Sequence, residues 1–327
     1  MENNVLISAK GLKKYFPISS FLGGKKKYIR AVDDIDLEIY KGETFGLVGE
    51  SGCGKSTLGK TLIRMYEPSA GKIYYKGEDI TDRKLNQIKS VQKSMQIIFQ
   101  DPYSSLNPFW NVEEILSEPL KNLKLQKSER YEKIKLILNK VGMSEDDLIK
   151  FPYEFSGGQR QRIGIARALL VNPEFIMCDE PIAALDVSIQ AQVVNLLQDL
   201  QKEFGLTYLF TAHDLSMVRY ISNRIGVMYL GSLVEIANSK SLFKKPLHPY
   251  TKALLSAVPS PDPSKKNIIE KVKISGEVSQ VFAGSNACRF APRCIYKTKI
   301  CEKECPKLRE IEDGHWVACH NAESINS

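Results

Sequence analysis

The feature that most constrains this chain is a glycine-rich run between residues 49 and 57, which reads GESGCGKST. It matches the pattern G-x-x-x-x-G-K-[ST], in which glycines let backbone N–H groups turn inward toward phosphate oxygens. Lys55 would supply a positive charge to the β- and γ-phosphates of a nucleotide, and Ser56 a hydroxyl ligand for Mg²⁺. The run predicts a P-loop that binds ATP through Gly49, Ser51, Gly52, Cys53, Gly54, Lys55, Ser56 and Thr57.

The sequence on either side of the run fits this prediction. Residues 45–48 form a short apolar strand that would enter the loop, and residues 56–65 have a helical pattern. The N-terminus of such a helix favours anions because its first N–H groups are unpaired. A glycine-rich turn that matched the pattern by chance would lack this context.

Other apolar segments predict an α/β fold with a parallel sheet. Residues 35–39 alternate between apolar and acidic side chains, which indicates a half-buried antiparallel strand. After Asp186, apolar residues recur at helical spacing as far as Phe204. Short apolar runs without alternation, typical of strands covered on both faces, lie at residues 95–99, 175–178, 208–210 and 225–229.

Two acidic residues, Asp179 and Glu180, directly follow one of these runs. In a chain with a P-loop, Asp179 at the strand end could hold the Mg²⁺ shell, and Glu180 could polarise the attacking water. A solvated strand end is the alternative interpretation of such a pair taken alone. The P-loop upstream favours the catalytic interpretation.

Length and composition suggest how the chain is divided. A chain of 327 residues exceeds one compact core and predicts a large domain with an appendage. Residues 101–155 carry a helical stripe without a strand signal, so we expect a helical subdomain inserted there. We expect an ATPase domain over residues 1–238 and a C-terminal extension over residues 239–327. The extension begins with a proline-rich stretch containing Pro246, Pro249, Pro259, Pro261 and Pro263.

The charge pattern argues against a nucleic-acid-binding surface. The formal net charge of +8 is spread along the chain and not gathered into a basic stripe. A diffuse excess fits a protein that binds nucleotides or lies beside an anionic membrane face. No secretory leader opens the chain, and no apolar run approaches ~18 residues. We therefore expect a cytosolic protein that does not itself cross a bilayer.

Further motifs follow in an order that resembles the ABC family of ATPases. Residues 155–162 read FSGGQRQR, which is similar to the ABC signature and lies before the acidic strand as in that family. Gln100 matches the Q-loop glutamine, Asp186 the D-loop and His213 the switch histidine. The resemblance implies a P-loop NTPase fold with a RecA-like parallel core, an antiparallel β subdomain, a helical subdomain and a C-terminal cysteine-containing extension.

The resemblance also implies a mechanism. Two ABC domains close head to tail, so each ATP is held by one P-loop and by the other domain's signature. Glu180 would act as the base on the attacking water, and His213 would contact the γ-phosphate. Mg²⁺ would be held through Ser56, Gln100 and Asp179. The signature residues that reach the partner's ATP would be Ser156, Gly157, Gly158 and Gln159.

An aromatic side chain near the N-terminus is expected to stack on adenine. Alignment with the family favours Phe16, with Tyr15 and Tyr28 as alternatives. Packing of Phe16 in the core is the other interpretation of this residue.

One pair of residues departs from the family pattern. Ile182 and Ala183 stand where the family usually has Thr and Ser, which removes two hydroxyls next to Glu180. Hydrolysis is still expected, because Glu180 and Asp186 remain. Equal turnover at both ATP sites of the assembly is left open.

Within the family, the chain looks like the ATP-binding subunits of bacterial oligopeptide and dipeptide importers, the peptide/nickel group. Residues 100–108 read QDPYSSLNP and residues 248–255 read HPYTKALL, and both runs are typical of that group. Residues 12–17 and the P-loop variant at 50–53 look like the second of its two paired ATPases. The resemblance implies a location on the cytoplasmic face of the membrane, with the segment after Gln100 receiving the permease. The partners it implies are a second homologous ATPase, two integral membrane permease subunits and an extracellular substrate-binding protein, with no nucleic acid.

Other functions stay open at this point. Nickel or another small solute could replace the peptide, because importers of the group use nearly the same ATPase. A weakly hydrolysing regulatory partner in a heterodimer would fit the change at Ile182 and Ala183. A soluble ABC protein acting on nucleic acid or ribosomes is disfavoured, because the chain has one cassette and no basic stripe.

Five of the seven cysteines fall between Cys288 and Cys319, which in a reducing compartment suggests metal ligation before disulfides. Cys288, Cys294, Cys301 and Cys319 are separated by five, six and seventeen residues, with no C-x-x-C pair. The importer family carries a similar set that binds a [4Fe–4S] cluster, so the resemblance implies a cluster on these four. Cys305 is a fifth candidate, and zinc or unligated cysteines stay open.

Overall fold

The computed structural model describes residues 4–18, 27–121, 123, 125–257 and 286–326. Pro259, Pro261 and Pro263 of the proline-rich stretch lie outside the described residues. The described residues form two compact units. The first contains residues 4–39, 44–82 and 212–326, and the second contains residues 40–43 and 83–211. The domain boundary expected near residue 238 stays a prediction.

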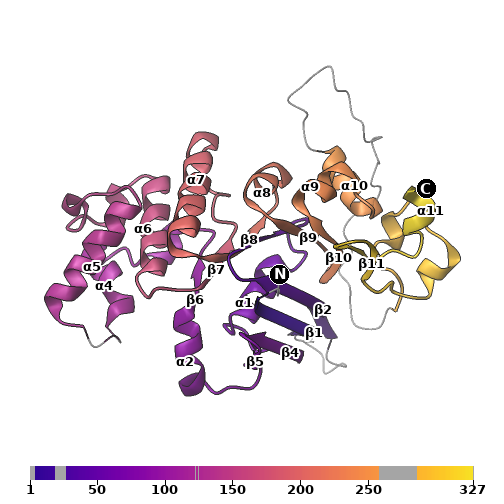
Figure 1. Cartoon of the computed structure of the whole chain (residues 1–327), viewed down its shortest axis with the longest axis horizontal. Helices are drawn as coiled ribbons and strands as arrows, with labels where there is room; N and C mark the ends of the chain where they lie inside the picture. Colours follow the sequence, from indigo (N-terminus) through magenta and orange to yellow (C-terminus); the bar gives the residue numbers. More distant parts are fainter. Residues whose placement is uncertain (1–3, 19–26, 122, 124, 258–285, 327) are drawn as a thin grey trace. The chain divides into compact units, whose positions relative to one another are not determined.

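The first unit contains a four-stranded sheet with the order β2-β1-β4-β5 (Figure 1). Strands β1 and β4 are antiparallel, with Ile7 opposite Tyr75. In β2, the apolar side chains of residues 35–39 are at most 4% exposed and the acidic ones between them are exposed. The predicted half-buried strand is therefore confirmed. The strands are β1 (Val5–Ile18), β2 (Lys27–Tyr40), β4 (Ala70–Tyr75) and β5 (Glu78–Asp79).

A second group of strands in this unit joins the P-loop strand to the C-terminal residues. Strands β3 and β9 are parallel, with Phe45 opposite Arg224 and Val48 opposite Val227. Strand β10 is antiparallel to β9 and to β12, and β12 is antiparallel to β11. The strands are β3 (Thr44–Val48), β9 (Arg224–Tyr229), β10 (Ser232–Asn238), β11 (Arg309–Glu312) and β12 (His315–Val317).

Short helices accompany these strands. Helix α1 follows the P-loop directly, and α8 packs against β3. The helices of this unit are α1 (Lys55–Leu62), α8 (Leu215–Ile221), α9 (Ser239–Lys244), α10 (Pro249–Ser256) and α11 (Ala322–Asn326), with 3₁₀ turns η4 (Ala291–Arg293) and η5 (Lys299–Glu302).

The second unit contains three parallel strands. Met95 lies opposite Phe175 in the β6–β7 pair, and Asp179 lies opposite Thr211 in the β7–β8 pair. Every residue of β7 is buried, as expected for an apolar run without alternation. The strands are β6 (Met95–Ile98), β7 (Phe175–Asp179) and β8 (Thr207–Ala212).

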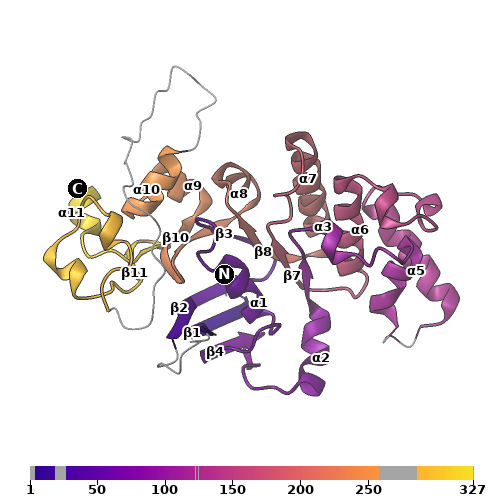
Figure 2. The ribbon, with the colours of Figure 1, turned by 180° about the vertical axis from the view of Figure 1, so that it is seen from behind.

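Helices make up the rest of the second unit. The described residues of 101–155 contain helices and turns without a strand, which confirms the predicted helical segment. Helix α7 confirms the pattern after Asp186 and ends at Gly205, whose φ of 66° gives the usual left-handed cap. Helix α3 packs against α6 (Figure 2). The helices are α2 (Leu85–Ser94), α3 (Pro102–Ser105), α4 (Val112–Ser117), α5 (Lys127–Lys140), α6 (Gly157–Leu169) and α7 (Val187–Phe204), with 3₁₀ turns η1 (Glu118–Leu120), η2 (Glu145–Asp147) and η3 (Pro152–Glu154).

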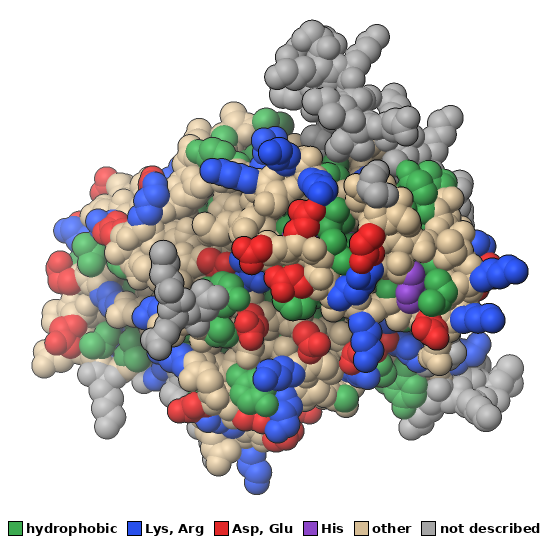
Figure 3. All heavy atoms as spheres, turned by 45° about the vertical axis from the view of Figure 1, so that its right-hand side comes forward, with side chains coloured by type: hydrophobic (Ala, Val, Ile, Leu, Met, Phe, Trp, Pro, Cys, Tyr) green, Lys and Arg blue, Asp and Glu red, His purple; other side chains and the backbone are tan. Residues whose placement is uncertain are grey.

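The surface carries both signs of charge. On the face drawn in Figure 3, lysine and arginine side chains are interspersed with aspartate and glutamate. Across the part of the chain that the structure describes, no helix is both long and apolar enough to span a membrane.

Candidate nucleotide-binding and hydrolysis site

Two glycines of the P-loop lie where a side chain would collide with backbone. A Cβ on Gly49 would lie 2.2 Å from the carbonyl oxygen of Met228. A Cβ on Gly54, which has a φ of 110°, would lie 2.1 Å from the carbonyl oxygen of Ala31. The loop therefore packs closely on its surroundings before α1 begins. The predicted sequence of strand, glycine loop and helix is confirmed.

Lys55 is the first residue of α1, and its side chain is enclosed by the loop. The residue is 4% exposed, and its Nζ donates to the carbonyl oxygens of Gly49 at 2.8 Å and Glu50 at 3.3 Å. Ser56 follows in the same helical turn. A cation and a hydroxyl thus lie together at a helix N-terminus, which favours a bound phosphate group.

The loop is also supported by residues from the C-terminal third of the chain, which the sequence analysis missed. The hydroxyl of the buried Tyr250 accepts a hydrogen bond from the Glu50 N–H at 2.9 Å. The N–H of Gly231 donates to the carbonyl of Cys53 at 2.8 Å. Burial raises the pKa of the Cys53 thiol, so this loop residue is a neutral packing group. The one sequence signal for Tyr250 is its place in the run at residues 248–255.

The two acidic residues at the end of β7, Asp179 and the next residue Glu180, lie in different environments. Asp179 is 3% exposed, whereas Glu180 is partly exposed. Thr211 on β8 holds this strand end, because its Oγ1 accepts the Glu180 N–H at 3.0 Å and lies 3.4 Å from Asp179 Oδ1. Glu180 has a φ of 45°, a left-handed conformation that costs about 1 kcal/mol or more for a non-glycine residue. Such strain is concentrated at functional sites.

The signature residues form the capped N-terminus of α6. Ser156 is the N-cap, and its Oγ accepts the Gln159 N–H at 3.3 Å while its own N–H donates to Gln159 Oε1 at 3.0 Å. A Cβ on Gly158 would lie 2.5 Å from Cγ2 of Ile189, so this helix end packs tightly against the start of α7. The unpaired N–H groups of the first turn carry partial positive charge, which suits them to a phosphate contact.

The residues predicted to form the D-loop and the Q-loop lie in the same unit as the predicted signature. Asp186 is the N-cap of α7, and its carbonyl accepts N–H groups of the first helical turn. Gln100 follows β6 and is exposed. Ile182, which departs from the family pattern, is 4% exposed, and its carbonyl accepts Gln190 Nε2 at 3.1 Å. The apolar side chain at this position is therefore packed inside the unit.

The remaining predicted residues belong to the first unit. His213 is exposed just before α8, whose N-cap Asp214 accepts the Ser216 N–H at 2.7 Å. The ring of Phe16 is half-buried and meets Tyr66 edge to face, with ring centroids 5.8 Å apart.

Both expected roles of Phe16 stay predictions, because a half-buried ring suits packing and stacking alike. The hydroxyl of Tyr15, an alternative adenine contact, is hydrogen-bonded to Asp33. Tyr28, the other alternative, is half-buried at the start of β2.

The predicted site residues are thus shared between the two units. The P-loop, His213 and Phe16 belong to the first. Gln100, the signature, Asp186 and the two acidic residues after β7 belong to the second. The roles expected of these residues in ATP binding and hydrolysis stay predictions.

The C-terminal cysteines are free thiols in the structure. Burial raises the pKa of Cys288 to about 12 and of Cys319 to about 11, and also raises that of Cys294. In each case the backbone N–H two residues further along opposes this effect. The hydroxyl of Thr298 lies 3.4 Å from Cys301 Sγ. Among the described residues, no three His, Cys, Asp or Glu side chains are gathered so as to hold a metal ion. Cys301 contributes electrostatically to the raised pKa of Cys288, Cys294 and Cys319, so the four thiols are neighbours, although among the described residues they do not form a metal-binding group.

The glycine loop, the acidic strand end and the capped signature helix define the class of ABC ATPases. Comparison with known protein families agrees. The family model described as ABC transporter matches residues 32–183. The model described as oligopeptide/dipeptide transporter, C-terminal region, matches residues 234–301.

Individual proteins resemble the chain over nearly its full length. It is 51% identical to the putative oligopeptide transport ATP-binding protein YkfD of Bacillus subtilis, over 98% of this chain and 97% of that protein. It is 44% identical to the dipeptide transport ATP-binding protein DppF of Haemophilus influenzae, over 97% of each. The chain therefore belongs to the ATP-binding proteins of oligopeptide and dipeptide ABC transporters.

Solved structures show the same cassette fold. CbiO1 of Clostridium perfringens, part of an ABC transporter complex, matches with a TM-score of 0.64 and 28% identity, over 74% of this chain and 91% of that one. The ATP-binding cassette MJ0796, solved as a dimer bound to ADP and Pi, matches with a TM-score of 0.63 and 26% identity, over 72% of this chain and 99% of that one.

Proposed function

We propose that this chain binds and hydrolyses ATP and thereby powers the import of oligopeptides or dipeptides through a membrane permease. The observation that carries the proposal is the P-loop, in which Lys55 lies enclosed by loop carbonyls at the start of α1. The relatives' names, which refer to oligopeptide and dipeptide transport, support the class of solute.

The predicted site residues have distinct tasks in hydrolysis. The hydroxyl of Ser56, the amide oxygen of Gln100 and the carboxylate of Asp179 are hard oxygen ligands of the kind that Mg²⁺ prefers. When bound, this ion neutralises charge on the phosphates. Glu180, strained and partly exposed, polarises the attacking water, and His213 contacts the γ-phosphate.

A second, homologous ATPase completes each ATP site. The N-terminus of α6 offers Ser156 and the N–H groups of Gly157, Gly158 and Gln159 to the ATP of that partner. The partner's signature serves the P-loop of this chain in return. We assign this chain to the second type of the paired ATPases, on the basis of residues 12–17 and 50–53.

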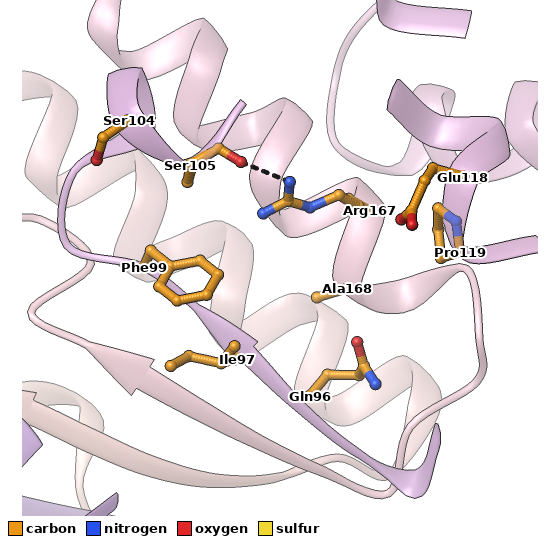
Figure 4. Close-up of a pocket in the computed structure, with 9 residues that line it drawn as sticks. All are labelled: Gln96, Ile97, Phe99, Ser104, Ser105, Glu118, Pro119, Arg167 and Ala168. Carbon is orange, nitrogen blue, oxygen red and sulfur yellow. Dashed lines mark hydrogen bonds between the residues drawn. The ribbon is translucent and has the colours of Figure 1, made fainter. Parts of the chain in front are cut away.

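A hollow of about 500 Å³ in the second unit is the proposed docking place for a permease helix (Figure 4). Arg167 crosses it and donates to the carbonyl oxygen of Ser105 at 2.6 Å. Burial lowers the pKa of Arg167, and the charge of Glu118 opposes that effect. Apolar side chains beside this polar pair would receive an apolar residue of the permease. The lining residues are Gln96, Ile97, Phe99, Ser104, Ser105, Glu118, Pro119, Arg167 and Ala168.

The assembly that follows has two integral membrane permease subunits and an extracellular substrate-binding protein. The ATPases lie on the cytoplasmic face of the membrane and contact the permease, not the solute. Co-purification from detergent-solubilised membranes tests this assembly. Recovery of the chain without any permease subunit would contradict the transport function.

Replacing Glu180 with Gln tests the catalytic role. The assembled transporter carrying Glu180→Gln in this subunit should lose ATPase activity by a factor of about 10²–10⁴ and still bind ATP. Glu174→Gln, at an acidic residue just before β7, is the matched control and should retain activity. The buried Ile182 favours a second candidate, a regulatory subunit that hydrolyses weakly. An unchanged rate in the Glu180 variant would support that candidate.

We also propose that an iron–sulfur cluster binds to Cys288, Cys294, Cys301 and Cys319. It is supported by thiol donors and by a backbone N–H group near three of the four sulfurs. Assembly would require the four thiols to converge and lose their protons. An absorbance band near 400 nm in anaerobically purified protein would support a cluster. A stoichiometric zinc content without that band would replace it with a zinc site.

A further inference from the structure

Arg293 of the C-terminal extension forms a bidentate ion pair with the second residue of the P-loop. Its Nη1 lies 2.9 Å from Glu50 Oε2, and its Nη2 lies 3.0 Å from Glu50 Oε1. The Arg293 side chain is 9% exposed and that of Glu50 is 28% exposed. Two parallel charge-assisted hydrogen bonds in a largely buried setting fix both distance and orientation. This contact therefore restrains the loop more than an exposed ion pair would.

An aromatic group of the same extension holds Glu50 from its backbone side. Tyr250 accepts the Glu50 N–H, and its ring lies 4.7 Å from that of Tyr229 and 5.5 Å from that of Phe290, between ring centroids. The hydroxyl of Tyr229 is 3.4 Å from Arg293 Nη1. Both the main chain and the side chain of Glu50 are thus bound by residues outside the P-loop.

Arg289, four residues before Arg293, supports the turn on which the loop rests. Its guanidinium group bonds the carbonyl oxygen of Leu230 and the carboxylate of Asp33. Leu230 has a φ of 43°, and the next residue, Gly231, donates its N–H to the carbonyl of Cys53 in the P-loop. The extension therefore reaches the loop by a second route.

These contacts matter because an anion site made of backbone N–H groups binds well only if the groups are already oriented. We propose that residues 288–294, with Tyr250, form a brace that holds the P-loop in the conformation that binds ATP. Arg293 is the main positioning residue and acts through Glu50. This inference rests on the proposed function, since it assigns the extension a role at the same ATP site.

Nucleotide affinity tests the brace without requiring hydrolysis. In the purified full-length chain, Arg293→Gln should weaken binding of a fluorescent ATP analogue about tenfold. Glu50→Gln should do the same, and the double variant should bind no worse than either single variant, because all three lose one shared contact. Arg293→Lys keeps the charge but loses the paired geometry and should give an intermediate loss.

Arg309→Gln is the matched control. Arg309 makes a bidentate pair with Glu323 in the same extension, at 2.5 and 2.6 Å, and contacts no P-loop residue among the described hydrogen bonds. The control should bind ATP within about twofold of the wild type. In the assembled transporter, Arg293→Gln should raise the KM for ATP and leave kcat nearly unchanged, a division that general destabilisation would not produce.

Several results would overturn the brace. One is wild-type affinity for the ATP analogue in both Arg293→Gln and Arg293→Lys. Another is a loss of affinity in Arg309→Gln equal to that in Arg293→Gln. A third is that the losses from Arg293→Gln and Glu50→Gln multiply in the double variant. A wild-type chain that binds no ATP would instead contradict the proposed function itself.

Discussion

The buried carboxylate of Glu235 lies 2.7 Å from Nε2 of His315, a residue 80 positions further along the chain. The same carboxylate accepts the N–H groups of Leu247 at 2.7 Å and His248 at 2.9 Å. One side chain on β10 therefore holds the start of α10 and the C-terminal hairpin β11–β12. A buried polar group is stable only when its hydrogen-bond partners are in place, so this side chain links the docking of the extension to the stability of the unit.

Removing His315 should destabilise the protein. His315→Ala deprives the buried Glu235 of one partner, and we expect a loss of about 2–3 kcal/mol in the free energy of unfolding. Urea denaturation of the full-length chain measures this loss. His320→Ala is the control, because His320 is only partly buried and, among the described residues, its ring bonds to the Glu304 carbonyl at 3.1 Å. This variant should change stability by less than about 0.5 kcal/mol. Equal effects of the two changes would contradict the special role of the buried carboxylate.

The buried His248 should make stability depend on pH. Burial lowers its pKa from 6.5 to about 4, with Glu235 opposing the shift, and its Nδ1 accepts the Tyr250 N–H at 3.0 Å. The unfolded chain takes up a proton at this residue near pH 6.5, whereas the folded protein resists it until about pH 4. Stability should therefore fall as the pH decreases from about 6.5 to about 4, by about 3 kcal/mol from this group.

His248→Asn isolates this contribution. Asparagine can accept at the N-cap of α10 but does not titrate. The variant should show a shallower loss of stability over the same pH range, measured as the midpoint of urea unfolding at each pH. Parallel curves for the wild type and the variant would show that His248 is not the responsible group.

Replacing Gly54 should abolish ATP binding. Gly54→Ala combines a φ of 110° with a Cβ 2.1 Å from the Ala31 carbonyl oxygen, so the loop must move. Gly77→Ala is the control, because it has a φ of 79° but nothing within 4 Å, and should cost only about 1 kcal/mol of stability. Isothermal titration with Mg²⁺ and a non-hydrolysable ATP analogue distinguishes the two. Normal affinity in Gly54→Ala would mean that the close packing of the loop is not required.

A change at Arg167 should weaken assembly with the permease. Arg167→Gln removes the bond to the Ser105 carbonyl and a charge from the proposed docking hollow. Arg162→Gln on the same helix loses a similar bond, to the Val141 carbonyl at 2.6 Å, without touching that hollow. The yield of permease that co-purifies with each tagged variant measures the difference. The melting temperature of each isolated chain shows whether the change has destabilised the fold. Equal recovery of permease with both variants would show that the permease does not dock at this hollow.

Much of the fold could be predicted, because the signals are local. The alternation at residues 35–39 and the apolar runs before Gly49 and Asp179 each require only the side-chain periodicity of a strand. The motifs in the P-loop and the signature likewise depend on neighbouring residues. Strand pairing of β10 with β12 could not be predicted, because the two segments are far apart in sequence and β12 is only three residues long.

The cysteine segment is a part of the chain whose arrangement could not be predicted from the sequence. The clustering of its cysteines predicts metal ligation, and the family resemblance implies an iron–sulfur cluster on four of them, yet among the described residues no three potential ligands are placed to hold a metal ion. Spacing constrains how far apart ligands can lie but does not orient their side chains. The folded chain shows instead that the two arginines between Cys288 and Cys294 contact the carbonyl oxygen of Leu230 and the carboxylate of Glu50.

The sequence was enough to define the chemistry of the P-loop, because inward N–H groups, a lysine and a hydroxyl must come from consecutive residues. It was not enough to show what holds that loop in place. Glu50 and Arg293 are 243 residues apart, and no local pattern pairs them. Their contact depends on how the extension returns to β10 and β9, a long-range arrangement that becomes visible only in the folded molecule.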